Sequence, residues 1–196
     1  MRQAALILGL GLAVALSACG KPADQGASKP AATPTPFVAN GWTSVFADAP
    51  GTVALLDGMG FRLSPYAEQG GAYVAHAQPT PMADPSAKPV NTANLTVTGD
   101  TRQLQSLQFA LDIVNLSSSP SAKAAFTAWV TRPISSLGAD GVEPVTRAIA
   151  AETETRGQLN GADYSVTRDP IDGGRRLVVT FTRPAAKPGT SEPRKQ

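Results

Sequence analysis

Hydrophobic and polar side chains alternate along two neighbouring segments near the middle of the chain. Residues 107–113 (LQFALDI) place four large apolar side chains on one face, and strict period-two alternation is typical of a strand buried on one side. Residues 94–98 precede them across a Gly-Asp-Thr connection, so the two segments predict an antiparallel hairpin. Leu104 is out of phase with Leu107, which predicts a β-bulge near Gln105.

A second hairpin is predicted near the C-terminus. Residues 164–168 and 176–181 flank residues 169–174, a turn-rich segment with Asp, Pro and a Gly pair. Two weaker strands are predicted at residues 61–63 and 72–76, with a Gly-Gly loop between them. Alternation predicts that the core-facing side chains of the last strand are Leu177, Val179 and Phe181.

Apolar residues at helical spacing occupy the region between the two hairpins. Ser119 is expected to cap a helix that has Pro120 at its first position, and Pro133 is expected to end it. A second helix is predicted from residue 144 to about residue 155. Gly157 is a natural stop for it.

A shorter helix is predicted at residues 51–57, and residues 77–93 form a long loop with four prolines. The expected order is a helix, four strands, two helices and two strands. Separated runs of strands and helices favour an α+β fold. We therefore predict a two-layer domain, in which two or three helices pack on one face of an antiparallel sheet of about five to six strands.

The first residues have the pattern of an export signal. Arg2 precedes an uninterrupted apolar run, residues 4–15, and small residues follow, as in a secretory signal peptide. The run is shorter than the roughly 20 apolar residues that a spanning helix needs. Residues 16–20 (LSACG) resemble the lipobox of bacterial lipoproteins.

That resemblance implies a diacylglyceryl group on the Cys19 sulfur, cleavage before Cys19, and an acyl chain on the new amino terminus. Several acyl chains on one residue would hold the protein firmly to a bilayer. Gly20 follows the cysteine where inner-membrane lipoproteins of enteric bacteria carry Asp. By that family rule, the expected location is the outer membrane of the cell envelope, facing the periplasm. An ordinary cleaved signal with a free Cys19 is the alternative.

Composition divides the chain into four parts. Residues 1–18 are the predicted signal peptide, and residues 19–36 the lipidated Cys with a Pro/Ala-rich tether that lacks large apolar residues. Residues 37–183 have the usual size of one domain, and we assign that domain to no known family. Residues 184–196 are a polar, Pro-containing tail that we expect to be disordered.

Charge and rare residues exclude several classes of function. The chain has 17 Lys and Arg against 15 Asp and Glu, a net charge of +2, which is too balanced for a protein that binds nucleic acid by its charge. One Cys and one His exclude an internal disulfide and the usual ligand set of a structural zinc site. We expect no metal and no cofactor beyond the lipid on Cys19.

Candidates for catalysis are few. His76 is the only histidine, so a Ser-His-Asp mechanism would have to use it. The carboxylates of Asp140, Glu143, Glu152 and Glu154 fall at a helix start and on a solvent-facing helix side. The simplest interpretation of these five residues is structural, and we expect no enzymatic activity.

Two groups of residues are candidates for binding. The nearest thing to a basic patch is the set on the terminal hairpin, Arg168, Arg175, Arg176 and Arg183. These side chains are candidates for contact with phosphate, carboxylates or an acidic partner, although basic strand residues more often protect a sheet edge. The aromatic candidates for lining an apolar groove, or else for filling the core, are Trp42, Phe46, Tyr66 and Tyr73.

The sequence thus predicts a membrane-anchored periplasmic lipoprotein that acts as a non-enzymatic binding module, with the membrane and an envelope protein as its partners. An envelope hydrolase that uses His76 is one alternative. A carrier of a lipid or small ligand is another, and it requires an apolar pocket between helices and sheet.

Overall fold

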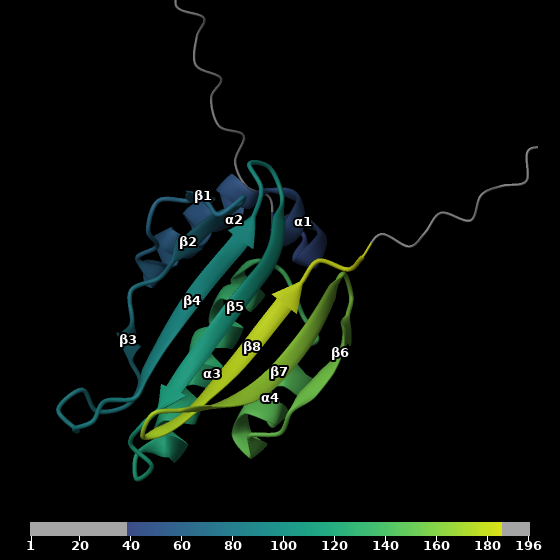
Figure 1. Cartoon of the computed structure of the whole chain (residues 1–196). Coiled ribbons are helices and arrows are strands. Elements are labelled where there is room, and N and C mark those ends of the chain that lie inside the picture. The colour runs from purple at the N-terminus through teal and green to yellow at the C-terminus, as the bar shows by residue number, and fades with distance from the viewer. Residues whose placement is uncertain (1–38, 186–196) are drawn as a thin grey trace, which may run out of the picture. The chain divides into compact units, whose positions relative to one another are not determined.

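Eight strands form one antiparallel sheet in residues 39–185, the part of the chain that the computed structural model describes (Figure 1). The spatial order is β1-β2-β4-β5-β8-β7-β6, and β3 also pairs with β4. The strands are β1 (Ala67–Gln69), β2 (Ala72–His76), β3 (Thr80–Pro81), β4 (Thr92–Gly99), β5 (Leu104–Ile113), β6 (Thr155–Leu159), β7 (Ala162–Ile171) and β8 (Gly174–Thr182). The predicted α+β class is confirmed.

Four α-helices pack on one face of this sheet (Figure 1). They are α1 (Gly41–Ala47), α2 (Ala49–Leu56), α3 (Ser119–Ser136) and α4 (Glu143–Ala151), and a π-helical turn, η1 (Asp57–Phe61), follows α2 directly. The sheet therefore has more strands than the predicted five to six. Alternation over two, three or five residues is too short to identify β3, β1 and β6 from the sequence.

Both predicted hairpins are present, and so is the bulge. Thr98 lies opposite Ser106 while Gly99 lies opposite Leu104, so Gln105 is the extra residue of β5. A Cβ atom on Gly99 would lie 2.2 Å from the carbonyl oxygen of Gln103. Only glycine therefore fits where β4 enters its turn.

The core lies between the sheet and the helices. The three predicted side chains of β8, which include Phe181, are fully buried there, as is Phe109 of β5. Aromatic contacts connect the layers, because Trp42 of α1 stacks on Phe181 with ring centroids 4.7 Å apart, and Trp129 of α3 packs edge-on to Phe109 at 5.7 Å. Each such side chain contributes about 1.5–3 kcal/mol by its burial.

The helix predicted between Ser119 and Pro133 differs from its prediction at both ends. Helix α3 begins at Ser119, so Ser118 occupies the cap position, and the Ser119 hydroxyl accepts a hydrogen bond from Arg175 instead. The helix continues past Pro133 to Ser136, so the expectation that Pro133 ends it is wrong. Proline removes a single N–H donor, and continuation allows Ile134 to be fully buried.

The second predicted helix is shorter than expected. Helix α4 ends at Ala151 because Glu152 has a left-handed conformation, with φ 53°. Thr155 and Gly157 consequently lie in strand β6 and not at a helix end. The predicted weak strand at residues 61–63 is also wrong, since Phe61 belongs to η1 and only Leu63 makes an isolated bridge, to Ala77.

The long predicted loop is held in place at its end. Asn91 is buried, and its side-chain amide donates hydrogen bonds to the Asn115 carbonyl and to the Ser118 hydroxyl, each 3.0 Å long. Its amide oxygen accepts from the backbone N–H groups of Val114 and Asn115. These bonds fix the entry to β4 against the start of α3.

The other face of the sheet carries no helix (Figure 1). Its side chains are mostly uncharged and polar, among them Asn94, Thr96, Thr98, Ser106, Gln108, Ser165, Thr167 and Thr180. We call this the uncovered face. In residues 39–185, no helix is both long and apolar enough to cross a membrane.

Candidate functional site

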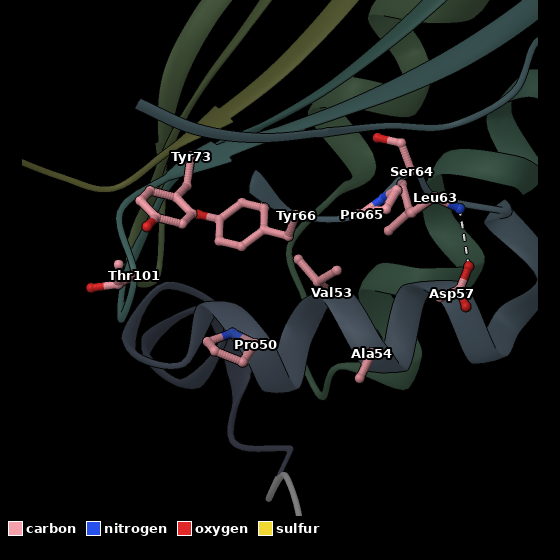
Figure 2. A pocket seen from close by; sticks show the side chains of 10 residues that line it. All are labelled: Pro50, Val53, Ala54, Asp57, Leu63, Ser64, Pro65, Tyr66, Tyr73 and Thr101. Carbon is pink, nitrogen blue, oxygen red and sulfur yellow. Dashed lines mark hydrogen bonds between the residues drawn. The ribbon is translucent and has the colours of Figure 1, made fainter. Parts of the chain in front are cut away.

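An apolar groove lies between helix α2 and strand β2, at one edge of the sheet. Its volume is about 620 Å³. Figure 2 shows the side chains of α2 on one side of the groove and two tyrosines on the other. The lining residues are Pro50, Val53, Ala54, Asp57, Leu63, Ser64, Pro65, Tyr66, Tyr73 and Thr101.

Local hydrogen bonds build the helical wall of the groove. The Asp48 carboxylate caps α2 by accepting from the Gly51 N–H at 2.9 Å, and Pro50 lies in the first turn, where a missing N–H costs nothing. At the other end of α2, the Asp57 carboxylate accepts from the Leu63 N–H at 3.0 Å. Asp57 therefore fixes the chain as it turns from the helix towards the sheet.

The opposite wall depends on a reversal of the chain after η1. Arg62 has a left-handed conformation, with φ 50°, which is uncommon for a residue other than glycine. Ser64 then bonds to both backbone groups of His76: its N–H donates to the carbonyl at 2.9 Å, and its hydroxyl accepts from the N–H at 3.0 Å. These bonds place Pro65 and Tyr66 beside β2.

Two tyrosines form the aromatic end of the groove. The rings of Tyr66 and Tyr73 lie 5.6 Å apart at an angle of 48°, and the Tyr66 hydroxyl donates to the Asp100 carbonyl at 3.0 Å. Burial, and then the negative charge of Asp100 and the neighbouring Tyr73, raise the pKa of Tyr66. Tyr66 therefore stays a neutral donor at physiological pH and holds the β4–β5 turn against the groove.

Four aromatic residues were candidates from the sequence for lining a groove or filling the core, and the structure places two of them in each location. Tyr66 and Tyr73 line the groove, whereas Trp42 and Phe46 of α1 are buried in the core. The contribution of α2 to the groove was missed. The Pro-initiated apolar helix was visible in the sequence, but its contact with β2 depends on the reversal at Arg62.

The predicted arginine set is not one surface. Arg175 extends to the helix side of β8, where its Nη2 atom donates to the Glu152 carboxylate at 2.7 Å and to Ser119 at 3.3 Å. Lys123 pairs with the same carboxylate at 3.0 Å. Hydrogen bonds from Arg175, then those from Lys123, lower the pKa of Glu152 from 4.5 to about 2, against the opposing effect of burial.

The sequence predicts that Glu152 lies on a solvent-facing side of a helix. That prediction is wrong, because the Glu152 side chain is only 13% exposed. The left-handed backbone at Glu152 costs roughly 1–2 kcal/mol. The two cationic partners offset that cost, since hydrogen bonds between charged groups contribute about 1.5–3 kcal/mol each. Glu152 and Arg175 therefore join α4 to β8.

The other three arginines lie apart from Arg175. Arg176 is on the uncovered face and binds the Asp112 carboxylate of β5 with two hydrogen bonds, of 2.5 and 2.8 Å. Arg183 follows the far end of β8 and bonds to the Gln103 side chain. Arg168 is exposed on β7. Arg175 and Arg176 are thus already engaged in ion pairs within the domain.

His76 is exposed at the end of β2, and its Nδ1 atom lies 3.1 Å from the Thr96 hydroxyl. The nearby Ser64 hydroxyl contacts the His76 backbone and not its ring. Within residues 39–185, the side-chain partner of the His76 ring is the Thr96 hydroxyl, and no carboxylate is bonded to the ring to orient it beside that hydroxyl. A triad on His76 needs both a nucleophile and an orienting acid.

Cys19 lies outside the described residues. Within residues 39–185, no group of three or more His, Cys, Asp or Glu side chains is arranged to hold a metal ion. Comparison with known proteins finds no matching family model, no matching curated protein and no matching solved structure. Neither the comparisons nor the described residues give evidence of an enzyme family or a catalytic site.

Proposed function

We propose that this chain is a bacterial lipoprotein, anchored in the envelope by lipid on Cys19. The support is the sequence of residues 16–20 after a short apolar run that Arg2 precedes. Gly20 in the position after the cysteine favours the outer membrane, with the folded part of the chain in the periplasm.

We further propose that the domain is a non-enzymatic binding module, and that its groove holds an extended apolar segment of another envelope protein. The groove carries this proposal, because it combines apolar walls with two tyrosines of which each offers a flat ring and a polar tip. Strand β1 adjoins it and, among residues 39–185, pairs with β2 alone. An extended segment in the groove can therefore also bond to the free backbone edge of β1.

A carrier of a small apolar ligand is the second candidate, and the volume of the groove favours it. A groove of about 620 Å³ is within the range of roughly 300–1,000 Å³ that small ligands occupy. Native mass spectrometry of the protein purified from membranes separates the two candidates. A bound species of a few hundred daltons supports the carrier, and a ligand-free mass supports the peptide-binding module.

The anchor is tested by Cys19→Ala together with globomycin, which blocks lipoprotein processing. The proposal predicts that the variant leaves the membrane fraction and that globomycin causes unprocessed precursor to accumulate. Unchanged processing and fractionation under both treatments would exclude the lipid anchor.

The groove is tested by pull-down from envelope membranes after crosslinking, with two variants that introduce the same charge. Ala54→Glu places a carboxylate on the exposed helical wall of the groove, and Gln108→Glu places one on the uncovered face. If a partner binds in the groove, Ala54→Glu is expected to lower the recovered amount of that partner about tenfold or more, since an unpaired charge is costly in an apolar site. Equal recovery with both variants would contradict the proposed site.

A further inference from the structure

A second hollow, of about 510 Å³, lies over β6 and β7 at the opposite edge of the sheet from the groove. Ala162, Tyr164 and Val166 of β7 are buried against the helices, so the residues between them face the uncovered side. The polar residues that line the hollow are Arg156, Gln158, Asp163, Ser165, Thr167 and Thr182. We call them the polar cluster.

Strand register brings the polar cluster together from three strands. Asp163 lies between Gln158 of β6 and Thr182 of β8 in one row across the sheet. Arg156 and Ser165 lie opposite each other in the next row. The hollow is thus built on paired backbone, which holds donors and acceptors at fixed spacing.

One acceptor of the polar cluster lacks a partner. The Oδ1 atom of Asp163 is buried and has no hydrogen-bond partner within residues 39–185. The ion pairs of these residues are those of Glu152 and Asp112, and they include neither Asp163 nor Arg156. The Asp163 side chain as a whole is only partly buried, so a small rotation of the carboxylate would present this oxygen to a ligand in the hollow. Because a buried acceptor without a donor is unfavourable, a donor from such a ligand would stabilise it there.

We infer that the polar cluster binds a neutral polyhydroxylated ligand, such as a saccharide of the cell envelope. A hydroxyl group both donates and accepts, so neighbouring hydroxyls of one ligand can donate to Asp163 and accept from Arg156. An anion would instead face the Asp163 carboxylate, and a cation would face the Arg156 guanidinium. Gln158 and Ser165 also donate and accept, which fits the same ligand class.

This site is independent of the apolar groove, because it shares no residue with it. The test uses the full lipidated chain in a detergent without a sugar headgroup. Chitotriose, an oligomer of an N-acetylated amino sugar, and maltotriose, a neutral hexose oligomer, are titrated to about 10 mM while amide NMR shifts are recorded, since weak sites bind in the millimolar range. The inference predicts saturable shifts in β6 and β7 with at least one trisaccharide, and which one binds distinguishes amino-sugar from hexose polymers.

Two Asp→Asn variants then assign the binding to the hollow. Asp163→Asn is expected to weaken the affinity about tenfold. Asp169→Asn, an exposed position on the same strand outside the hollow, is expected to leave it unchanged. If Asp163→Asn fails to fold, Ser165→Ala takes its place. Absence of saturable shifts with both sugars, equal affinity of the two Asn variants, or tighter binding of inorganic phosphate at the same residues would overturn the inference.

Discussion

The two faces of the sheet differ in what their side chains require. On the covered face, apolar residues such as Phe109 and Phe181 are fully buried under the helices. On the uncovered face, where Figure 1 shows no helix, the intervening residues are mostly polar and at least partly exposed. The apolar groove lies where the covered face reaches its edge and α2 leaves part of it open (Figure 2). The difference points to the groove as the place where apolar surface still lacks a partner.

The largest expected change in the free energy of unfolding comes from a residue of strand β5 whose neighbour in sequence serves as the control. Phe109→Ala is expected to lower the free energy of unfolding by about 3–5 kcal/mol, because it leaves a cavity beside Trp129 and Phe181. Gln108→Ala, one residue away on the uncovered face, is expected to change it by less than about 0.5 kcal/mol. Urea unfolding of both variants measures the contrast, and similar losses would contradict the assignment of faces.

The second prediction concerns the ion pair on the covered side. Glu152→Gln is expected to cost about 2 kcal/mol at pH 7, because it weakens the bonds to Arg175 and Lys123. The folded state lowers the pKa of Glu152 from 4.5 to about 2. The stabilisation is therefore complete above pH 4.5 and is lost as the pH falls towards 2.

Unfolding of the wild type and of Glu152→Gln should thus be compared from pH 7 down to pH 2. The difference in unfolding free energy is expected to narrow steadily below pH 4.5. A difference that stays constant over this range would mean that the charge of Glu152 does not contribute.

Of the three interactions tested, the ion pair on the uncovered face is expected to contribute least. The Arg176 side chain is 41% exposed, so solvent and salt screen its attraction to Asp112. Asp112→Asn is expected to cost less than about 1 kcal/mol, and the cost should shrink further at high salt. If Asp112→Asn lowered the free energy of unfolding as much as Glu152→Gln does, the ion pairs on the two faces would not differ in their contribution to stability.

Much of the fold could be predicted because several elements carry their own periodic pattern. Strands β4, β5, β7 and β8 alternate clearly, and even the bulge at Gln105 follows from the phase of Leu104. Helix α3 was predicted from its spacing, although its end was misplaced at Pro133. There, continuation of the helix buries Ile134 and Leu137, and their burial offsets the lost hydrogen bond and the steric cost of an internal proline. A local pattern does not report such a balance.

The candidate sites could be predicted only in part, because they depend on contacts between distant segments. Tyr66 and Tyr73 were recognised as possible groove residues, but Val53 joins them only through the reversal after η1. Arg175 and Arg176 were grouped, with Arg168 and Arg183, because all four belong to the terminal hairpin. In a strand, neighbours point to opposite faces, and each finds its own carboxylate.

The most direct test of the account is site-specific photocrosslinking in living cells. A photoreactive amino acid at Ala54 lies in the groove, and the same group at Gln108 lies on the uncovered face as a control. The account predicts one discrete crosslinked protein from position 54 and none from position 108. Mass spectrometry of the peptides joined to position 54 identifies that protein. Equal crosslinking from both positions, or none from position 54, would contradict the proposal that the groove is the binding site.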